Sequence, residues 1–243
     1  MRLNKQSMPK TAVILQSNYL PWRGYFDLLA RADEAILFDS VQYTRRDWRN
    51  RNRIKTAQGP EWITIPVEVK GRYFQRIDET RIATSDWAQA HIRTIDLAYR
   101  HAGGFGEAGP WLFSLLEGLA AEPMLTQVNE HLIRAVMERL GIETPLRRCT
   151  SLLGRAEMAV MDPSERLVAL CRAVGADRYL SGPAARQYLD EARFAHENIG
   201  LEWMSYEGYP EYPQLWGAFV PHVSIVDLLL NTGAAAPRYL RGS

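Results

Sequence analysis

Two short apolar runs with a helical stretch between them constrain the fold of this chain more than any other feature. The runs are Ala12–Gln16 and Ala35–Phe38, and each has the length and composition of a buried strand. Between them, Pro21 suits the first position of a helix that continues to Ala32 with apolar residues at helical spacing. A strand, a helix and a strand within about 30 residues form a βαβ unit with parallel strands. The chain therefore begins as an α/β fold.

The later segments continue this pattern after an interruption. Helical periodicity dominates a middle region, which we interpret as a helical insert with helices at Trp87–His101, Pro110–Ala121 and Thr126–Leu140. Asp162, Pro163 and Glu165 then form the N-cap, N1 and N3 pattern of a helix start. Further strands are expected at Asp177–Leu180, Leu201–Tyr206 and Trp62–Val67, and further helices at Ala184–Phe194 and Ser224–Asn231.

These elements predict an α/β fold with an open, mostly parallel, Rossmann-like sheet and a helical insert. Residues 11–85 form an N-terminal βαβ part that carries the main site, residues 86–145 form the insert, and residues 146–233 form a C-terminal α/β part that completes the same domain. The basic stretch from Arg45 to Lys55, closed by a turn signal at Gln58–Pro60, is expected to leave the sheet as a charged excursion.

Composition excludes several classes of protein. The 243 residues carry 29 Lys and Arg against 28 Asp and Glu, so the net charge of +1 gives no overall signal for binding nucleic acid or a membrane surface. No apolar run approaches the length of a membrane span, and the stretch after Met1 lacks the apolar segment of a signal peptide. With only two cysteines, a disulfide framework is excluded, and we expect a cytoplasmic protein.

Common catalytic motifs are also missing. The five histidines lie far apart at no ligand spacing, so we expect no metal site. A glycine-rich string at Gly104–Gly109 matches a dinucleotide fingerprint, but a predicted helix precedes it where the fingerprint needs a strand. Cys171 is expected to be buried in a helix, whereas Cys149 follows two arginines that favour a thiolate, without a visible base beside it.

Polar residues follow both N-terminal strands where parallel strands place ligands. Gln16, Ser17 and Asn18 come after the first strand, and Asp39 and Gln42 come after the second. Because the carboxyl ends of parallel strands meet at one sheet edge, we expect Gln16, Asn18 and Asp39 to share a pocket, with Asp39 and Gln16 as catalytic candidates. Tyr19 and Trp22 either stack on a flat ligand or cover the entrance of the helix.

The basic stretch supplies the clearest binding candidates. The candidates are Gln42, just before the stretch, and Trp48, Arg49, Asn50, Arg51, Asn52 and Arg53 within it, which combine forked donors with an aromatic ring. Clustered arginines and asparagines suit phosphate or carboxylate, and a single short patch favours a small phosphorylated ligand over nucleic acid. Ser181 and Gly182, at the start of a predicted helix, form a second potential anion site or an ordinary capped turn.

Five strings in this chain strongly resemble the WbqC-like family: QSNYLPWRGYF (16–26), FDSVQYTRRDWRNRNRIKT (38–56), EWITIPV (61–67), YLSGPAARQYL (179–189) and FVPHVSIVDLLLNTG (219–233). The resemblance spans nearly the whole chain and implies a role in cell-surface polysaccharide (O-antigen) or other specialised biosynthesis, such as modification of an amino sugar. The family-typical positions are Gln16, Tyr19, Pro21, Trp22, Gly24, Tyr25, Asp39, Gln42, Trp48, Asn50, Arg51, Asn52, Ser181, Gly182, Asp227 and Gly233.

A fainter likeness connects the first βα unit with HIGH-type nucleotidyltransferases such as pantothenate synthetase. The positions equivalent to their HxGH motif are Trp22, Arg23, Gly24 and Tyr25, so both histidines are missing. The likeness therefore extends to the architecture and not to the histidine chemistry.

Two functional hypotheses follow. In the first, the chain is a biosynthetic transferase or ATP-dependent ligase that binds a small anionic substrate, with a nucleotide or nucleotide-linked compound as a possible cofactor or substrate. In the second, the Arg/Asn-rich segment makes the chain a non-catalytic module for nucleic acid or protein. Donor, acceptor, use of ATP and oligomeric state are left open by the sequence.

Overall fold

The computed structural model describes residues 9–241, which form two compact units. The first unit contains the described residues up to Leu15, together with Arg31–Phe38 and Thr144–Ser205. The second contains Gln16–Ala30, Asp39–Glu143 and the described residues from Tyr206 onward. The chain thus passes between the units several times. The stretch after Met1, in which no apolar segment of a signal peptide is expected, lies mostly outside the described residues, because these begin at residue 9.

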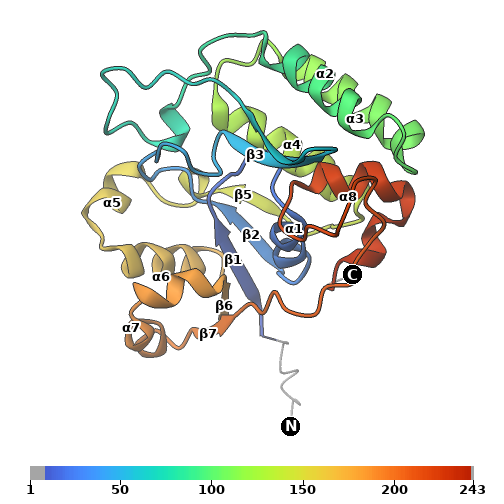
Figure 1. Cartoon of the computed structure of the whole chain (residues 1–243). Coiled ribbons are helices and arrows are strands. Elements are labelled where there is room, and N and C mark those ends of the chain that lie inside the picture. Colours follow the sequence, from blue (N-terminus) through green and yellow to red (C-terminus); the bar gives the residue numbers. More distant parts are fainter. Residues whose placement is uncertain (1–8, 242–243) are drawn as a thin grey trace. The chain divides into compact units, whose positions relative to one another are not determined.

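A parallel five-stranded sheet forms the centre of the first unit (Figure 1). Its strands are β1 (Thr11–Leu15), β2 (Glu34–Leu37), β5 (Leu146–Arg148), β6 (Arg178–Ser181) and β7 (Gly200–Trp203), in the order β5-β2-β1-β6-β7. Ala12 of β1 lies opposite Glu34 on one side and Tyr179 on the other. The predicted α/β class with an open parallel sheet is confirmed.

Helices of the first unit bury one face of this sheet. They are α5 (Arg155–Val160), α6 (Pro163–Ala173) and α7 (Glu191–His196), with short 3-10 segments η2 (Cys149–Ser151) and η3 (Pro183–Gln187). Ile14 and Ile36 share a core with Leu170 of α6 and Phe194 of α7, because alternate strand residues face the same side. The start of α6 is confirmed, but the single helix expected at Ala184–Phe194 is wrong. The chain breaks before α7, whose N-cap Asp190 accepts the amides of two following residues.

The second unit combines a hairpin with helices. It contains α1 (Arg23–Ala30), the antiparallel strands β3 (Arg51–Thr56) and β4 (Gly59–Thr64), and the helices α2 (Trp87–Tyr99), α3 (Phe105–Leu119), α4 (Leu125–Arg139) and α8 (Ile225–Thr232), with 3-10 segments η1 (Ile77–Glu79) and η4 (Gly233–Tyr239). α2 lies beside α3 and β3, and α3 packs on α8 (Figure 1). The three predicted helices of the middle region are confirmed, although α3 starts earlier than expected.

The glycine-rich string serves packing between α3 and α8. Gly104 is the N-cap of α3, and a Cβ atom there would lie 2.3 Å from the backbone nitrogen of Gly233. The Gly104 amide donates to the carbonyl of Leu230 at 2.9 Å. α2 precedes the string, as expected, so the strand required by a dinucleotide fingerprint is not there.

The charged stretch corrects one prediction. Arg45–Lys55 was expected to leave the sheet as a charged excursion, and it does lie outside the five-stranded sheet, but a strand was not expected there: Arg51–Thr56 is strand β3, paired with β4 in a register that places Arg53 opposite Trp62. Asn52 and Ile54 are buried while Arg51 and Arg53 remain partly exposed, which is the alternation of a strand. Charges on the outward positions concealed this alternation, since a search for apolar runs does not detect a strand with polar residues on both faces.

Candidate functional site

A cavity of about 230 Å³ lies in the second unit. It is lined by Asn18, Pro21, Trp22, Trp48, Asn52, Arg53 and His222. Five of these residues were predicted from sequence to bind substrate, whereas Pro21 and His222 were not. The cavity brings together the loop that follows Gln16, the start of the hairpin and the segment that precedes α8, which are far apart along the chain.

The loop that brings Asn18 and Pro21 to the cavity is held in an unusual conformation. Leu20 has a φ of 42°, in the left-handed region that a leucine rarely adopts. Its carbonyl accepts hydrogen bonds from Asn52 Nδ2 at 2.9 Å and from Ser224 Oγ at 2.8 Å, and Asn52 also donates to the carbonyl of Tyr19 at 3.1 Å. Asn52 therefore holds the loop in place through its side-chain amide. It lines the cavity, but its amide nitrogen is already occupied by the loop carbonyls.

Aromatic rings form the apolar side of the cavity. The Trp22 ring lies edge-on to His222 and to Tyr206, each with ring centroids 5.0 Å apart. Gly24 allows this placement, because a Cβ atom there would lie 2.3 Å from the indole Cζ2 of Trp22. Trp22 and Gly24 are thus coupled: the glycine in this string makes room for the ring.

Arg53 supplies positive charge to the cavity. Its Nη2 donates to the carbonyl of His222 at 3.2 Å, and its Nε is buried without a hydrogen-bond partner among the described residues. A guanidinium carries five N–H donors and stays charged at physiological pH. Arg53 lines the cavity and uses one of these donors in a hydrogen bond with the described residues, so donors are left for an anion there.

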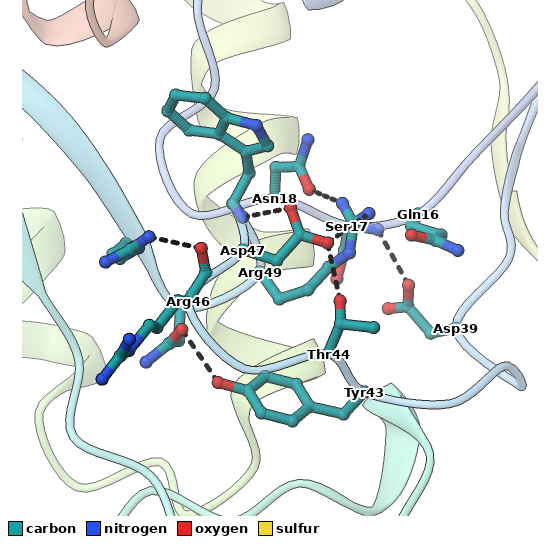
Figure 2. Close-up of polar contacts among 12 residues, drawn as sticks. Gln16, Ser17, Asn18, Asp39, Tyr43, Thr44, Arg46, Asp47 and Arg49 are labelled. Carbon is teal, nitrogen blue, oxygen red and sulfur yellow. Dashed lines mark hydrogen bonds and ion pairs between the residues drawn. The ribbon is translucent and has the colours of Figure 1, made fainter. Parts of the chain in front are cut away.

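Arg49 holds Asn18, a residue of the cavity lining, as Figure 2 shows. Its guanidinium donates to Asn18 Oδ1 and pairs with Asp47 Oδ2 at 3.4 Å, and its carbonyl accepts from Asn129 Nδ2 at 2.8 Å. Because Arg49 occupies the amide oxygen of Asn18, the NH₂ group is the donor that Asn18 can offer to a ligand. Burial raises the pKa of Asp47, but the charge of Arg49, the hydrogen bonds from Thr44 and the Trp48 amide, and the charge of Arg51 together lower it below its ordinary value.

Asp39 is buried beside this loop, with 4% of its surface exposed. It accepts hydrogen bonds from the Ser17 amide at 2.8 Å and from the Thr126 hydroxyl (Figure 2 shows the Ser17 contact). Burial raises the pKa of Asp39, while the hydrogen bonds from Thr126 and Ser17 act in the opposite direction. Of Gln16, Asn18 and Asp39, only Asn18 lines the cavity. The catalytic roles of Asp39 and Gln16 stay a prediction.

The remaining residues that the sequence analysis predicted to bind substrate lie outside the cavity lining. Tyr19 is fully buried and its hydroxyl contacts His91 Nδ1 at 2.8 Å. Asn50 is buried between the Tyr43 hydroxyl and the carbonyl of Ile65. Gln42 donates to the carbonyl of Tyr73, and Arg51 stacks on Trp62. Ser181 and Gly182 belong to the first unit, at the end of β6. His222 and Trp62 lie in two of the strings that resemble the family, but neither was singled out in advance as a site residue.

Three further features concern metal ions, membranes and the cysteine thiols. Within residues 9–241, no three His, Cys, Asp or Glu side chains come together in a way that could hold a metal ion. No helix in that range is long and apolar enough to cross a membrane. Cys171 is buried, and burial raises the pKa of its thiol to about 12.

Comparison with known proteins decides the family. The model of the WbqC-like protein family matches residues 16–239. The chain belongs to the WbqC-like protein family. It is also 50% identical, over 233 residues, to the protein named Uncharacterized protein Rv1507c of Mycobacterium tuberculosis (strain ATCC 25618 / H37Rv), a match that covers 96% of this chain and 98% of the relative. No solved structure matches the chain significantly.

In this WbqC-like protein, the matched region includes the whole cavity lining, from Asn18 to His222, as well as Ser181 and Gly182. Family membership is consistent with a role in biosynthesis.

Proposed function

We propose that this WbqC-like protein is a biosynthetic transferase or ligase that binds a small, phosphate-bearing, ring-containing substrate, such as an amino sugar phosphate, in the cavity around Trp22 and Arg53. The observation that carries the proposal is the combination of aromatic walls with a guanidinium that has free donors. Ring faces of a substrate pack on aromatic side chains, and a phosphate accepts charge-assisted hydrogen bonds from arginine.

The size of the cavity supports a single-ring substrate. Pockets for drug-sized ligands typically have about 300–1,000 Å³. At about 230 Å³ this cavity is smaller, and it suits one sugar or a similar ring. A concave, partly apolar site of this kind also favours a small molecule over an extended nucleic acid, which binds along grooves and flat faces.

Isothermal titration calorimetry with N-acetylglucosamine 1-phosphate and N-acetylglucosamine 6-phosphate tests the proposal, with inorganic phosphate for comparison. Arg53→Gln keeps a polar but shorter side chain and removes the charge. Since a hydrogen bond to a charged group is worth about 1.5–3 kcal/mol, we expect the dissociation constant of a sugar phosphate to rise roughly tenfold to a hundredfold.

Arg178→Gln is the matched control. Arg178 lies on β6 of the first unit and pairs with Glu202 at 3.1 Å, so its loss should leave the affinity unchanged. Equal binding by the Arg53→Gln variant and the wild type, or no binding of either sugar phosphate by the wild type, would contradict the proposal. A steep loss of RNA binding with rising salt, without sugar phosphate binding, would favour a nucleic-acid module instead.

A further inference from the structure

Two exposed tryptophans lie beside the cavity, Trp62 on the hairpin and Trp48 in the loop that precedes it. Trp48 is 39% exposed and Trp62 is 45% exposed, and their ring centroids are 5.3 Å apart with the planes tilted by 39°. Trp62 belongs to β4 and is absent from the cavity lining, whereas Trp48 lines the cavity. The two rings therefore continue the aromatic wall of the cavity onto the surface of the hairpin.

Two arginines cover these rings. The guanidinium carbon of Arg51 is 4.0 Å from the centroid of Trp62, and that of Arg53 is 5.7 Å from Trp62 and 6.0 Å from Trp48. Arg51 and Arg53 are two residues apart on β3, and Arg53 lies opposite Trp62, so all three side chains share one face of the hairpin. We call Trp48, Trp62, Arg51 and Arg53 the tryptophan–arginine shelf.

The shelf has donors available for a ligand. Arg51 donates through Nη2 to the carbonyl of Arg46 and Arg53 through Nη2 to the carbonyl of His222, and within residues 9–241 neither guanidinium makes a further hydrogen bond. Among the arginines of residues 45–53, Arg49 is the one that forms an ion pair with a carboxylate in the part of the chain that the structure describes, and its partner is Asp47. The two shelf arginines thus carry positive charge without a carboxylate partner, next to planar ring faces.

Cavity and shelf are continuous, because Trp48 and Arg53 belong to both. A ligand that fills the cavity with one ring can place its phosphate at Arg53, and a second phosphate next to it meets Arg51. A further ring beyond the phosphates reaches the part of the Trp62 ring that Arg51 and Arg53 leave exposed. Ring stacking on an aromatic side chain is a favourable contact for a nucleic-acid base.

From this arrangement we infer that the substrate is a nucleoside diphosphate-linked sugar, with the sugar in the cavity, the diphosphate at Arg53 and Arg51, and the base on Trp62. The inference rests on the proposed function, since it assumes that the cavity binds the sugar phosphate. It adds a binding site for the nucleotide on the hairpin, with Trp62 as the residue that recognises the base.

Titration calorimetry with three kinds of probe tests the inference: UDP-, dTDP- and GDP-linked sugars, the corresponding nucleoside diphosphates, and N-acetylglucosamine 1-phosphate. We expect the wild type to bind at least one nucleotide-linked sugar tenfold or more tightly than the sugar phosphate. Trp62→Ala should weaken the nucleotide-linked sugar and the nucleoside diphosphate about tenfold while leaving the sugar phosphate unchanged. Trp62→Phe, which keeps a ring face, should restore most of the affinity.

Tyr73→Ala is the matched control, because Tyr73 is an exposed aromatic residue outside the shelf, and its loss should change none of the affinities. The inference is overturned if no nucleotide-linked sugar binds more tightly than the sugar phosphate, or if Trp62→Ala weakens all probes equally. Tighter binding of a single-stranded RNA oligomer than of any nucleotide-linked sugar also overturns it. Intact sugar phosphate binding in these cases leaves the proposed function standing, whereas its loss from the wild type removes both.

Discussion

At the scale of single residues, buried hydrogen bonds separate the residues that shape the site from those that face it. Asn52 was predicted to bind substrate, yet its amide donates to two carbonyls of the loop at Tyr19 and Leu20. Asn50 is engaged in the same way by Tyr43 and Ile65. Sequence identifies such residues as important but cannot tell a ligand contact from a loop contact, because both use the same amide group.

Asp39 allows a sharp test at this scale. Its carboxylate accepts from the Ser17 amide and the Thr126 hydroxyl, so Asp39→Ala leaves two buried donors without partners. Each such loss costs about 1–3 kcal/mol. We expect a lower thermal midpoint and weaker sugar phosphate binding in this variant, because Ser17 directly precedes Asn18 of the cavity.

Asp39→Asn is the matched comparison. An asparagine can still accept from the Ser17 amide, and burial already disfavours the charged carboxylate, so we expect a thermal midpoint at pH 7 no lower than that of the wild type and nearly unchanged ligand affinity. Differential scanning fluorimetry and calorimetry measure both quantities. A variant that binds normally but has lost turnover would support the catalytic role predicted for Asp39, whereas lost binding would argue against the positioning role.

At the scale of elements, the sequence is informative where a pattern has one physical cause. The N-cap, N1 proline and N3 glutamate at Asp162 predict a helix, and α6 begins there with a reciprocal capping box: Asp162 accepts the Glu165 amide at 2.9 Å, and Glu165 accepts the Asp162 amide at 3.2 Å. β3 was missed because its outward positions are charged and its buried ones include Asn52. Its stability comes from pairing with β4, which is a contact that local sequence does not contain.

The capping box at α6 predicts a stability effect without a functional one. Asp162→Ala removes the acceptor for the Glu165 amide, and loss of an N-cap of this kind typically lowers the thermal midpoint of a chain of this size by about 2–4 °C. α6 belongs to the first unit, so sugar phosphate binding in the second should be unchanged. Arg172→Gln, on the exposed side of α6, is the control. Ser164→Ala is not suitable, because Ser164 Oγ accepts a hydrogen bond from the Asp190 amide at 3.0 Å. An unchanged midpoint would mean that the cap contributes little to the folded state.

At the scale of the whole molecule, chain order predicts the class of the fold but not how the chain is shared between units. The strands β1 and β2 were expected and are parallel, whereas the residues that follow them, Gln16 and Asp39, begin segments of the second unit. Such a division depends on contacts between segments far apart in the chain, and local periodicity carries no information about them. The predicted division at residues 85 and 145 stays a prediction.

The buried His91 gives the molecule a predictable response to acid. Its Nε2 donates to the carbonyl of Thr64 at 3.1 Å, so its Nδ1 accepts from the Tyr19 hydroxyl at 2.8 Å, which requires the neutral ring. Burial lowers the pKa of His91 from 6.5 to about 4, with the hydrogen bond to Thr64 acting weakly in the opposite direction. The unfolded chain therefore binds the proton more tightly than the folded one, and folding stability decreases as the pH falls from 6.5 towards 4.

A shift of this size corresponds to a loss of free energy of unfolding on the order of 3 kcal/mol by pH 4, since one pKa unit is worth about 1.36 kcal/mol. Asp39 and Asp227 act in the opposite sense, because burial raises the pKa of each and the folded state then binds the proton more tightly as the pH falls towards 3.8. The measurement is therefore made in the Asp39→Asn background, where the comparison of His91→Gln with its parent cancels the effect of Asp227. Urea unfolding at pH 7, 6, 5 and 4.5 should give a falling free energy there. His91→Gln should start lower at pH 7 but show a flatter dependence, whereas His131→Gln, at an exposed position of α4, should keep the steep one. Equal slopes for His91→Gln and its parent would show that another group governs the acid response, because glutamine cannot titrate in this range.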